Sequence, residues 1–87
     1  MPEEVGMSEQ ALSLMLGVYE HYKGNRYRVE GVAHHSEDLT ELVVYRALYG
    51  EGRLWARPLE MFFETVEYEG VIKPRFRYIG NDNNESR

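Results

Sequence analysis

The run from residue 42 to residue 63, LVVYRALYGEGRLWARPLEMFF, constrains the fold of this chain most strongly. Two segments rich in β-branched, aromatic and aliphatic residues flank a Gly-Glu-Gly-Arg turn, which is the pattern of a β-hairpin. Pro58 then stands where a short helical turn can start, and apolar residues follow it. The run therefore predicts antiparallel strands at residues 42–49 and 54–57, followed by a helical turn.

The rest of the chain adds three more predicted strands. Residues 17–22 and 27–33 alternate β-forming and polar residues around a short polar turn, which predicts a first hairpin. Within the second of these strands, Gly31 marks a bulge or a bend. Residues 75–79 alternate once more and predict a closing strand, reached through an acidic connection over residues 64–73.

Five short strands in meander order, with a helical turn between the fourth and fifth, are typical of a mainly β, SH3-like barrel. An OB-like barrel is the alternative, but it would place its helix between the third and fourth strands. We expect an N-terminal arm or short helix over residues 1–16, the β domain over 17–79 and a disordered polar tail over 80–87. Ser8 is the predicted N-cap of the helix.

Composition narrows the class of protein. With 87 residues and no cysteine, the chain supports one small domain held by packing alone. Of the formal charge of −5, the segments outside residues 17–79 carry −4, from five acids and one base. A nearly neutral domain with acidic ends does not favour nucleic-acid binding, which needs a surplus of lysine and arginine. Because no apolar run is long enough to cross a bilayer, we expect a cytoplasmic protein without membrane contact.

Several short motifs occur in order along the chain: GxYxHYKG at 17–24, GVAHHSE at 31–37, LVVYRALYG at 42–50, LWxRPLxMF at 54–62 and PRF at 74–76, where x is any residue. Through these motifs the chain resembles a bacterial family of small domains of unknown function, number 1653. The resemblance covers roughly residues 17–79. It implies a prokaryotic domain, standalone or appended, with no assigned activity, so it implies no catalytic residues.

The histidines do not form a recognisable reactive site. His35, Ser36 and Glu37 carry the residue types of a catalytic triad, but adjacent side chains point apart and cannot make the required hydrogen bonds. His21, His34 and His35 lack the spacing of a known metal site. We therefore predict no catalytic residues, no metal and no cofactor.

Two arginines give a sharper prediction. If the Gly-Glu-Gly-Arg turn closes a regular hairpin, Arg46 lies directly opposite Arg57, with Trp55 on the same face of the sheet. Like charges at such positions repel, so either carboxylates of the protein or an anionic ligand must neutralise them. The second interpretation predicts an exposed arginine and aromatic surface, to which we add Tyr22 and His35 as ligand-binding residues.

The leading hypothesis is a non-enzymatic binding module that recognises an unknown protein, a peptide or a small anionic ligand through this surface. The first alternative is nucleic-acid or nucleotide binding by the same residues. The second alternative is a small hydrolase that uses a histidine as its base. We expect a monomer or a homodimer, because exposed strand edges are compatible with both.

Overall fold

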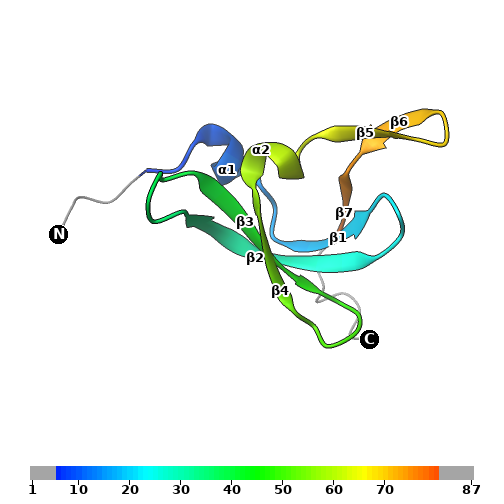
Figure 1. Cartoon of the computed structure of the whole chain (residues 1–87), viewed down its shortest axis with the longest axis horizontal. Coiled ribbons are helices and arrows are strands. Elements are labelled where there is room, and N and C mark those ends of the chain that lie inside the picture. The colour runs from blue at the N-terminus through cyan, green and yellow to red at the C-terminus, as the bar shows by residue number, and fades with distance from the viewer. Residues whose placement is uncertain (1–5, 81–87) are drawn as a thin grey trace.

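A computed structural model describes residues 6–80, which fold into two antiparallel β-sheets and two short helices (Figure 1). The prediction of a mainly β protein is confirmed. Residues 1–5 and 81–87 lie outside the described range, and with them most of the predicted tail; Gly80 itself ends the last strand. The elements, in chain order, are α1 (Glu9–Ser13), β1 (Gly17–His21), β2 (Arg26–His34), β3 (Glu41–Ala47), β4 (Leu54–Pro58), α2 (Leu59–Phe62), β5 (Thr65–Tyr68), β6 (Val71–Pro74) and β7 (Phe76–Gly80).

The larger sheet has five strands in the order β4-β3-β2-β1-β7, so the last strand lies beside the first. The predicted bulge near Gly31 is confirmed, because the register between β2 and β3 shifts between Val29 and Gly31. Strands β4 and β7 form the two edges and do not pair with each other within residues 6–80. A closed SH3-like barrel is therefore not confirmed.

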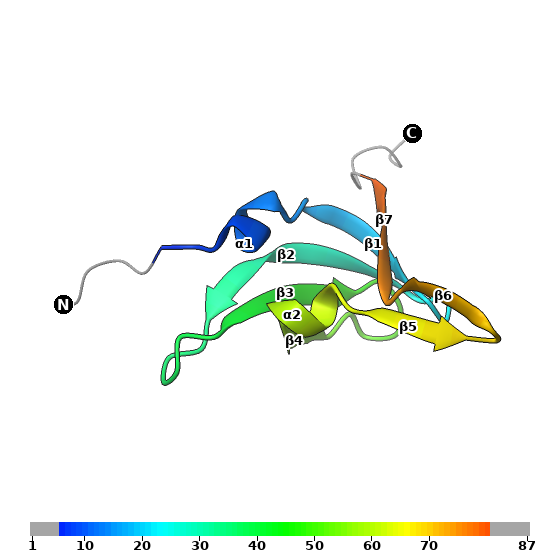
Figure 2. The same cartoon turned by 90° about the horizontal axis from the view of Figure 1, so that it is seen from above.

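The smaller sheet is the hairpin of β5 and β6, which projects from the rest of the molecule in both Figure 1 and Figure 2. We predicted only an acidic connection over residues 64–73, and the structure corrects this by placing two strands there. Glu69 and Gly70 both have positive φ, 53° and 80°, which suits a tight two-residue turn between twisted strands. At the base of the hairpin the backbone N–H of Arg75 donates to the carbonyl of Glu64 at 2.9 Å.

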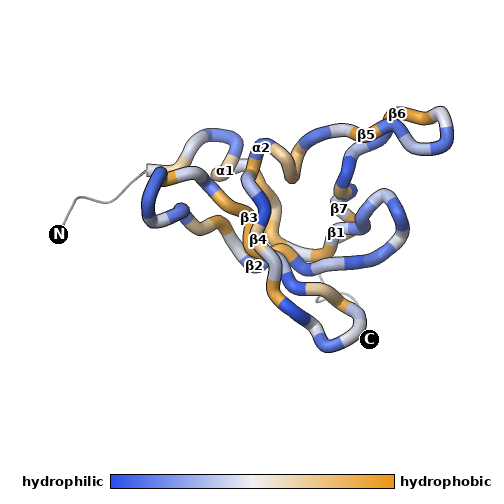
Figure 3. Tube along the Cα trace, viewed as in Figure 1, coloured by the Kyte–Doolittle hydropathy of each residue, from blue (hydrophilic) through white to orange (hydrophobic). Residues whose placement is uncertain are grey.

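The core lies on one face of the larger sheet, which we call the inner face. Figure 3 shows apolar residues along β3, whereas the turn between β5 and β6 is hydrophilic. At its centre the ring of Phe62, from α2, stacks on Phe76, from β7, with ring centroids 4.3 Å apart and planes 8° apart. The buried residues of the core cluster are Ala11, Leu14, Tyr19, Val29, Val43, Tyr45, Leu59, Phe62 and Phe76.

Helix α1 is capped as predicted and docks on this core. The Ser8 hydroxyl oxygen accepts a hydrogen bond from the Ala11 N–H at 3.0 Å, and Ala11 and Leu14 are buried. The N–H and the hydroxyl of Ser8 also donate to the two carboxylate oxygens of Glu41, each at 2.7 Å. These bonds tie the N-terminal arm to the start of β3. Over residues 6–80, no helix has the length and apolar character needed to span a membrane.

The predicted register of the β3–β4 hairpin is wrong. Tyr45 pairs with Trp55, and Arg46 pairs with Leu54 rather than with Arg57. The turn takes more residues than expected, because Gly50 and Gly52 both adopt positive φ. The resulting shift is three residues, and an odd shift moves every side chain of β4 to the other face of the sheet.

Candidate functional site

The corrected register separates the two arginines that the sequence placed together. Val43 and Tyr45 are buried on the inner face, and their partners on β4 are Arg57 and Trp55. Cross-strand partners share a face, so Trp55 and Arg57 lie on the inner face. Arg46 lies on the opposite, outer face of the sheet.

On the outer face the charge of Arg46 is balanced within the protein. Its neighbour on β2 is Arg28, and the carboxylate of Glu30 serves both: Oε2 lies 3.4 Å from Nε of Arg28 and 3.5 Å from Nε of Arg46. One guanidinium nitrogen of Arg46 also donates to the carbonyl of Gly52 at 2.9 Å. Arg46 therefore has a complete structural role in bracing the β3–β4 turn.

Arg57, on the inner face, is different. Its Nε donates to the hydroxyl of Tyr45 at 3.3 Å, and its guanidinium carbon lies 5.9 Å from the ring centroid of Phe76. Among residues 6–80 it is the arginine without a carboxylate partner. The six other arginines in this range have one: Arg26 and Arg77 pair with Glu20, Arg28 and Arg46 with Glu30, Arg53 with Glu51, and Arg75 with Glu64.

Trp55 lies two residues before Arg57 on the same face and is 52% exposed. It lines a cavity of about 310 Å³ together with Ala47, Tyr49 and the turn between β3 and β4. The hydroxyls of Tyr49 and Tyr27 lie 2.6 Å apart, and burial together with this hydrogen bond raises the pKa of Tyr27 to about 12. We call Trp55, Arg57 and the residues that support them, Tyr45, Tyr49 and Phe76, the Trp55–Arg57 surface.

His21 adjoins this surface from β1. Its ring centroid lies 5.0 Å from that of Phe76, and its Nδ1 accepts the N–H of Lys23 at 3.2 Å. Burial first, and then the positive charge of Arg57, lower the pKa of His21 below its ordinary value of 6.5. The imidazole is therefore neutral at neutral pH, and Arg57 contributes a positive field that reaches this residue.

The two remaining predicted ligand-binding residues occupy other places. Tyr22 contacts His21, with ring centroids 4.4 Å apart, and lines a separate hollow of about 360 Å³ beside the β5–β6 hairpin. His35 lies in the loop between β2 and β3, where its Nδ1 accepts the N–H of Glu37 at 3.1 Å and lies 3.5 Å from Asp38. The structure thus groups Trp55 with Arg57. Tyr22 lies next to this pair, because it contacts His21. Arg46 lies on the outer face of the sheet, and His35 lies in the loop between β2 and β3.

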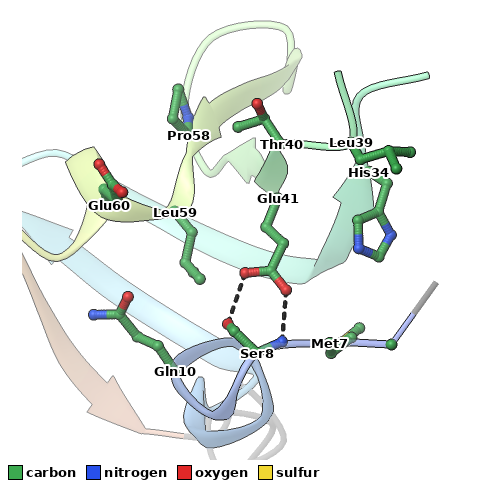
Figure 4. A pocket seen from close by; sticks show the side chains of 11 residues that line it. Met7, Ser8, Gln10, His34, Leu39, Thr40, Glu41, Pro58, Leu59 and Glu60 are labelled. Atoms are coloured by element: carbon green, nitrogen blue, oxygen red, sulfur yellow. Dashed lines mark hydrogen bonds between the residues drawn. The ribbon is translucent and has the colours of Figure 1, made fainter. Parts of the chain in front are cut away.

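A further hollow, of about 910 Å³, is lined by none of the predicted site residues (Figure 4). It lies between the N-terminal arm, the start of β3 and the start of α2, and both oxygens of Glu41 in it are bonded to Ser8. Within the described part of the chain, no group of three or more histidine, cysteine, aspartate or glutamate side chains is placed to hold a metal ion. The Trp55–Arg57 surface is thus the candidate site.

Sequence reasoning missed the residues that hold this site together. Tyr45 and Phe76 read as ordinary core residues, and the register that we predicted placed Arg57 on the opposite face of the sheet from Tyr45. The available signal was the pair of glycines at positions 50 and 52, which permits a longer turn and hence another register.

Comparison with known proteins gives two matches and one negative result. The model of the family described as protein of unknown function (DUF1653) matches residues 17–78. The fold is similar to the crystal structure of a DUF1653 protein from Bordetella bronchiseptica, with a TM-score of 0.76 and 36% sequence identity over 82% of this chain and 94% of that chain. No curated protein matches the sequence.

Proposed function

The chain belongs to the DUF1653 family of proteins of unknown function, and because membership assigns no activity, we propose a function from the Trp55–Arg57 surface. This surface makes the protein a non-enzymatic binding module for a peptide or small ligand that carries an anionic group beside an apolar one. The observation that carries the proposal is Arg57, which has no carboxylate partner among residues 6–80 whereas six other arginines do.

The geometry of Arg57 suits an anion. Its Nε is engaged by the Tyr45 hydroxyl, and Phe76 lies beside the guanidinium. The two terminal nitrogens remain for a ligand, and their planar arrangement matches a carboxylate or phosphate. Half-burial of Arg57 lowers the local dielectric, so an ion pair formed there is worth more than one in open water.

The neighbouring Trp55 supplies the apolar part of the site. Its large, exposed ring lines the 310 Å³ cavity, whose size is at the lower end of the range for small-ligand sites. Exposed tryptophan and arginine residues are the types most often found to dominate binding energies at interfaces. A ligand with a carboxylate and an aromatic or aliphatic group would therefore use both residues.

The two alternatives have less support. Nucleic acid is a polyanion, and among residues 6–80 only Arg57 is an arginine without a carboxylate partner to bind it. The net charge of the chain, −5, would also repel a polyanion. A hydrolase would need a histidine base, yet Nδ1 of His21 and Nδ1 of His35 already accept backbone N–H groups. A cytoplasmic location remains a prediction from the sequence.

The proposal is tested with N-acetylphenylalanine, whose carboxylate is free, and with its amide, which has the same shape and no charge. The chain has one tryptophan, so the indole N–H of Trp55 gives a single NMR signal to follow during titration. We expect a saturable shift with the acid and affinity about tenfold weaker for the amide. Arg57→Gln should reduce the affinity for the acid by about the same factor.

Arg46→Gln is the matched control, because it removes an arginine of the neighbouring strand from the other face. It should leave the affinity unchanged within about twofold. Equal affinity for acid and amide, or unchanged affinity in Arg57→Gln with a native spectrum, would disprove the proposed site.

A further inference from the structure

The free edge of β4 extends this site, and the following inference rests on the proposed function. We propose that the ligand is an extended peptide that adds to β4 as an antiparallel strand. It places an acidic side chain against Arg57 and, two residues along, an apolar side chain in the cavity beside Trp55.

The hydrogen bonding of the hairpin leaves specific backbone groups of β4 available. The N–H of Ala47 donates to the carbonyl of Arg53 at 3.0 Å, which makes these two a hydrogen-bonded pair. In an antiparallel ladder such pairs alternate, so Trp55 and Arg57 direct their backbone groups toward β3. Leu54 and Ala56 consequently direct theirs outward, to an edge that no described strand occupies.

The sequence of the edge agrees with this geometry. Pro58 belongs to the same outward set as Ala56, and its missing N–H costs no bond to β3. Leu54 is 53% exposed, and Ala56 is exposed as well. The edge therefore offers two complete sets of backbone donor and acceptor, at positions 54 and 56, and ends at a proline.

Strand addition places the side chains of the peptide where the proposed site needs them. Opposite residues on paired strands have Cβ atoms about 5 Å apart, and every second side chain faces the same side of the sheet. A glutamate opposite Arg57 would reach the free terminal nitrogens of its guanidinium. The residue two positions away would face Trp55, as in other complexes in which a peptide extends a sheet.

A second copy of this chain is a poorer occupant of the edge. Strand β4 has the sequence LWARP, which contains no acid. Pairing of β4 with β4 would bring a second Arg57 to a small interface and leave both charges without a carboxylate. Charge complementarity therefore favours an acidic peptide from another chain.

The test uses an acetylated and amidated hexapeptide with the sequence threonine, valine, glutamate, valine, phenylalanine, threonine. Its glutamate and phenylalanine lie on one face and its two valines on the other. In antiparallel addition the amides of the valines point to β4, whereas those of the glutamate and phenylalanine point away. We expect N-methylation of the second valine to weaken binding by about tenfold, and N-methylation of the glutamate by less than about twofold.

A protein variant removes the other hydrogen bond of the same residue pair, the one that Ala56 N–H donates to the peptide. Ala56→Pro removes an outward N–H without removing a bond to β3, and Ala56→Ser keeps that N–H. The proline variant should lose about tenfold in affinity for the hexapeptide and keep its affinity for N-acetylphenylalanine.

The outcomes separate the two proposals. Equal weakening by both N-methyl groups, or no binding of the hexapeptide while N-acetylphenylalanine still shifts Trp55, would overturn strand addition and leave the binding site in place. Failure of both ligands would overturn the binding site too. A concentration-dependent dimer in sedimentation that Ala56→Pro abolishes would assign the edge to a second copy and overturn the peptide.

Discussion

Arg46 and Arg57 lie on adjacent strands of one sheet, yet their surroundings differ completely. Arg46 shares Glu30 with Arg28 and bonds to the carbonyl of Gly52. Arg57 rests on Tyr45 and Phe76 and has no carboxylate among the described residues. The first arginine is neutralised by a carboxylate of the sheet, whereas the second meets no carboxylate among residues 6–80.

This difference shows why two like residues in one hairpin deserve separate functional hypotheses. A satisfied arginine contributes to stability and little to recognition, since a ligand would have to displace its existing partners. An arginine that only aromatic groups hold keeps its terminal donors available. Three experiments test the contrast, beginning with the change of largest expected effect.

The aromatic support of Arg57 should be the most sensitive part of the inner face. Phe76 is buried, stacks on Phe62 and lies beside the Arg57 guanidinium. Phe76→Ala should lower the free energy of unfolding by about 3–5 kcal/mol, since it leaves a cavity in the core. Urea denaturation measures this loss. Ile72→Ala, at a position 72% exposed on the projecting hairpin, is the control and should cost less than about 1 kcal/mol. A Phe76 variant as stable as the control would show that Phe76 does not anchor the core of the inner face.

The two arginines should differ in what their removal does to stability. Arg46→Gln removes the bond to Gly52 and one partner of Glu30, so we expect a loss of about 1 kcal/mol at this half-exposed position. Arg57→Gln should change the free energy of unfolding by less than about 0.5 kcal/mol. Thermal or urea unfolding of both variants checks the order. If Arg57→Gln were the more destabilising change, Arg57 would be a structural residue and the contrast would fail.

The smallest expected effect concerns pH and His21. Its pKa is lowered in the folded protein, so between the lowered value and 6.5 the unfolded chain binds a proton that the folded chain does not. Stability contributed by neutral His21 is therefore complete above pH 6.5 and is lost as pH falls through the folded pKa. His21→Gln should flatten this part of the stability profile. An anion bound at Arg57 should also raise the pKa of His21 toward 6.5, which NMR titration of its ring measures; an unchanged pKa in a saturated complex would contradict the placement of the anion.

Much of the fold followed from local patterns. The alternation over residues 17–22 and 27–33, the Ser8 cap and the bulge at Gly31 are features of single segments, and each was predicted correctly. The β5–β6 hairpin was not predicted, because its acidic residues were given more weight than a sequence signal for a hairpin. This signal was the presence of β-branched residues on both sides of the Glu-Gly pair at positions 69–70.

The candidate site was harder to predict because it depends on register. Trp55 and Arg57 were chosen correctly as neighbours on one face of β4, since that follows from the period of a strand. Which face they share depends on the length of a turn with two glycines, and one odd step reverses the answer. The pairing of Arg46 with Glu30 depends further on a bulge between Val29 and Gly31 in the neighbouring strand.

The base of the β5–β6 hairpin carries a consequence for how this domain tolerates insertion and deletion. The carbonyl of Glu64 and the N–H of Arg75 are joined by one hydrogen bond of 2.9 Å, so the chain returns to the point at which it left. Its two strands bond to each other and to no strand of the larger sheet. The number of residues between positions 65 and 74 therefore does not determine where β7 lies. During evolution this segment could gain, lose or exchange residues while the sheet that carries Trp55 and Arg57 kept its register.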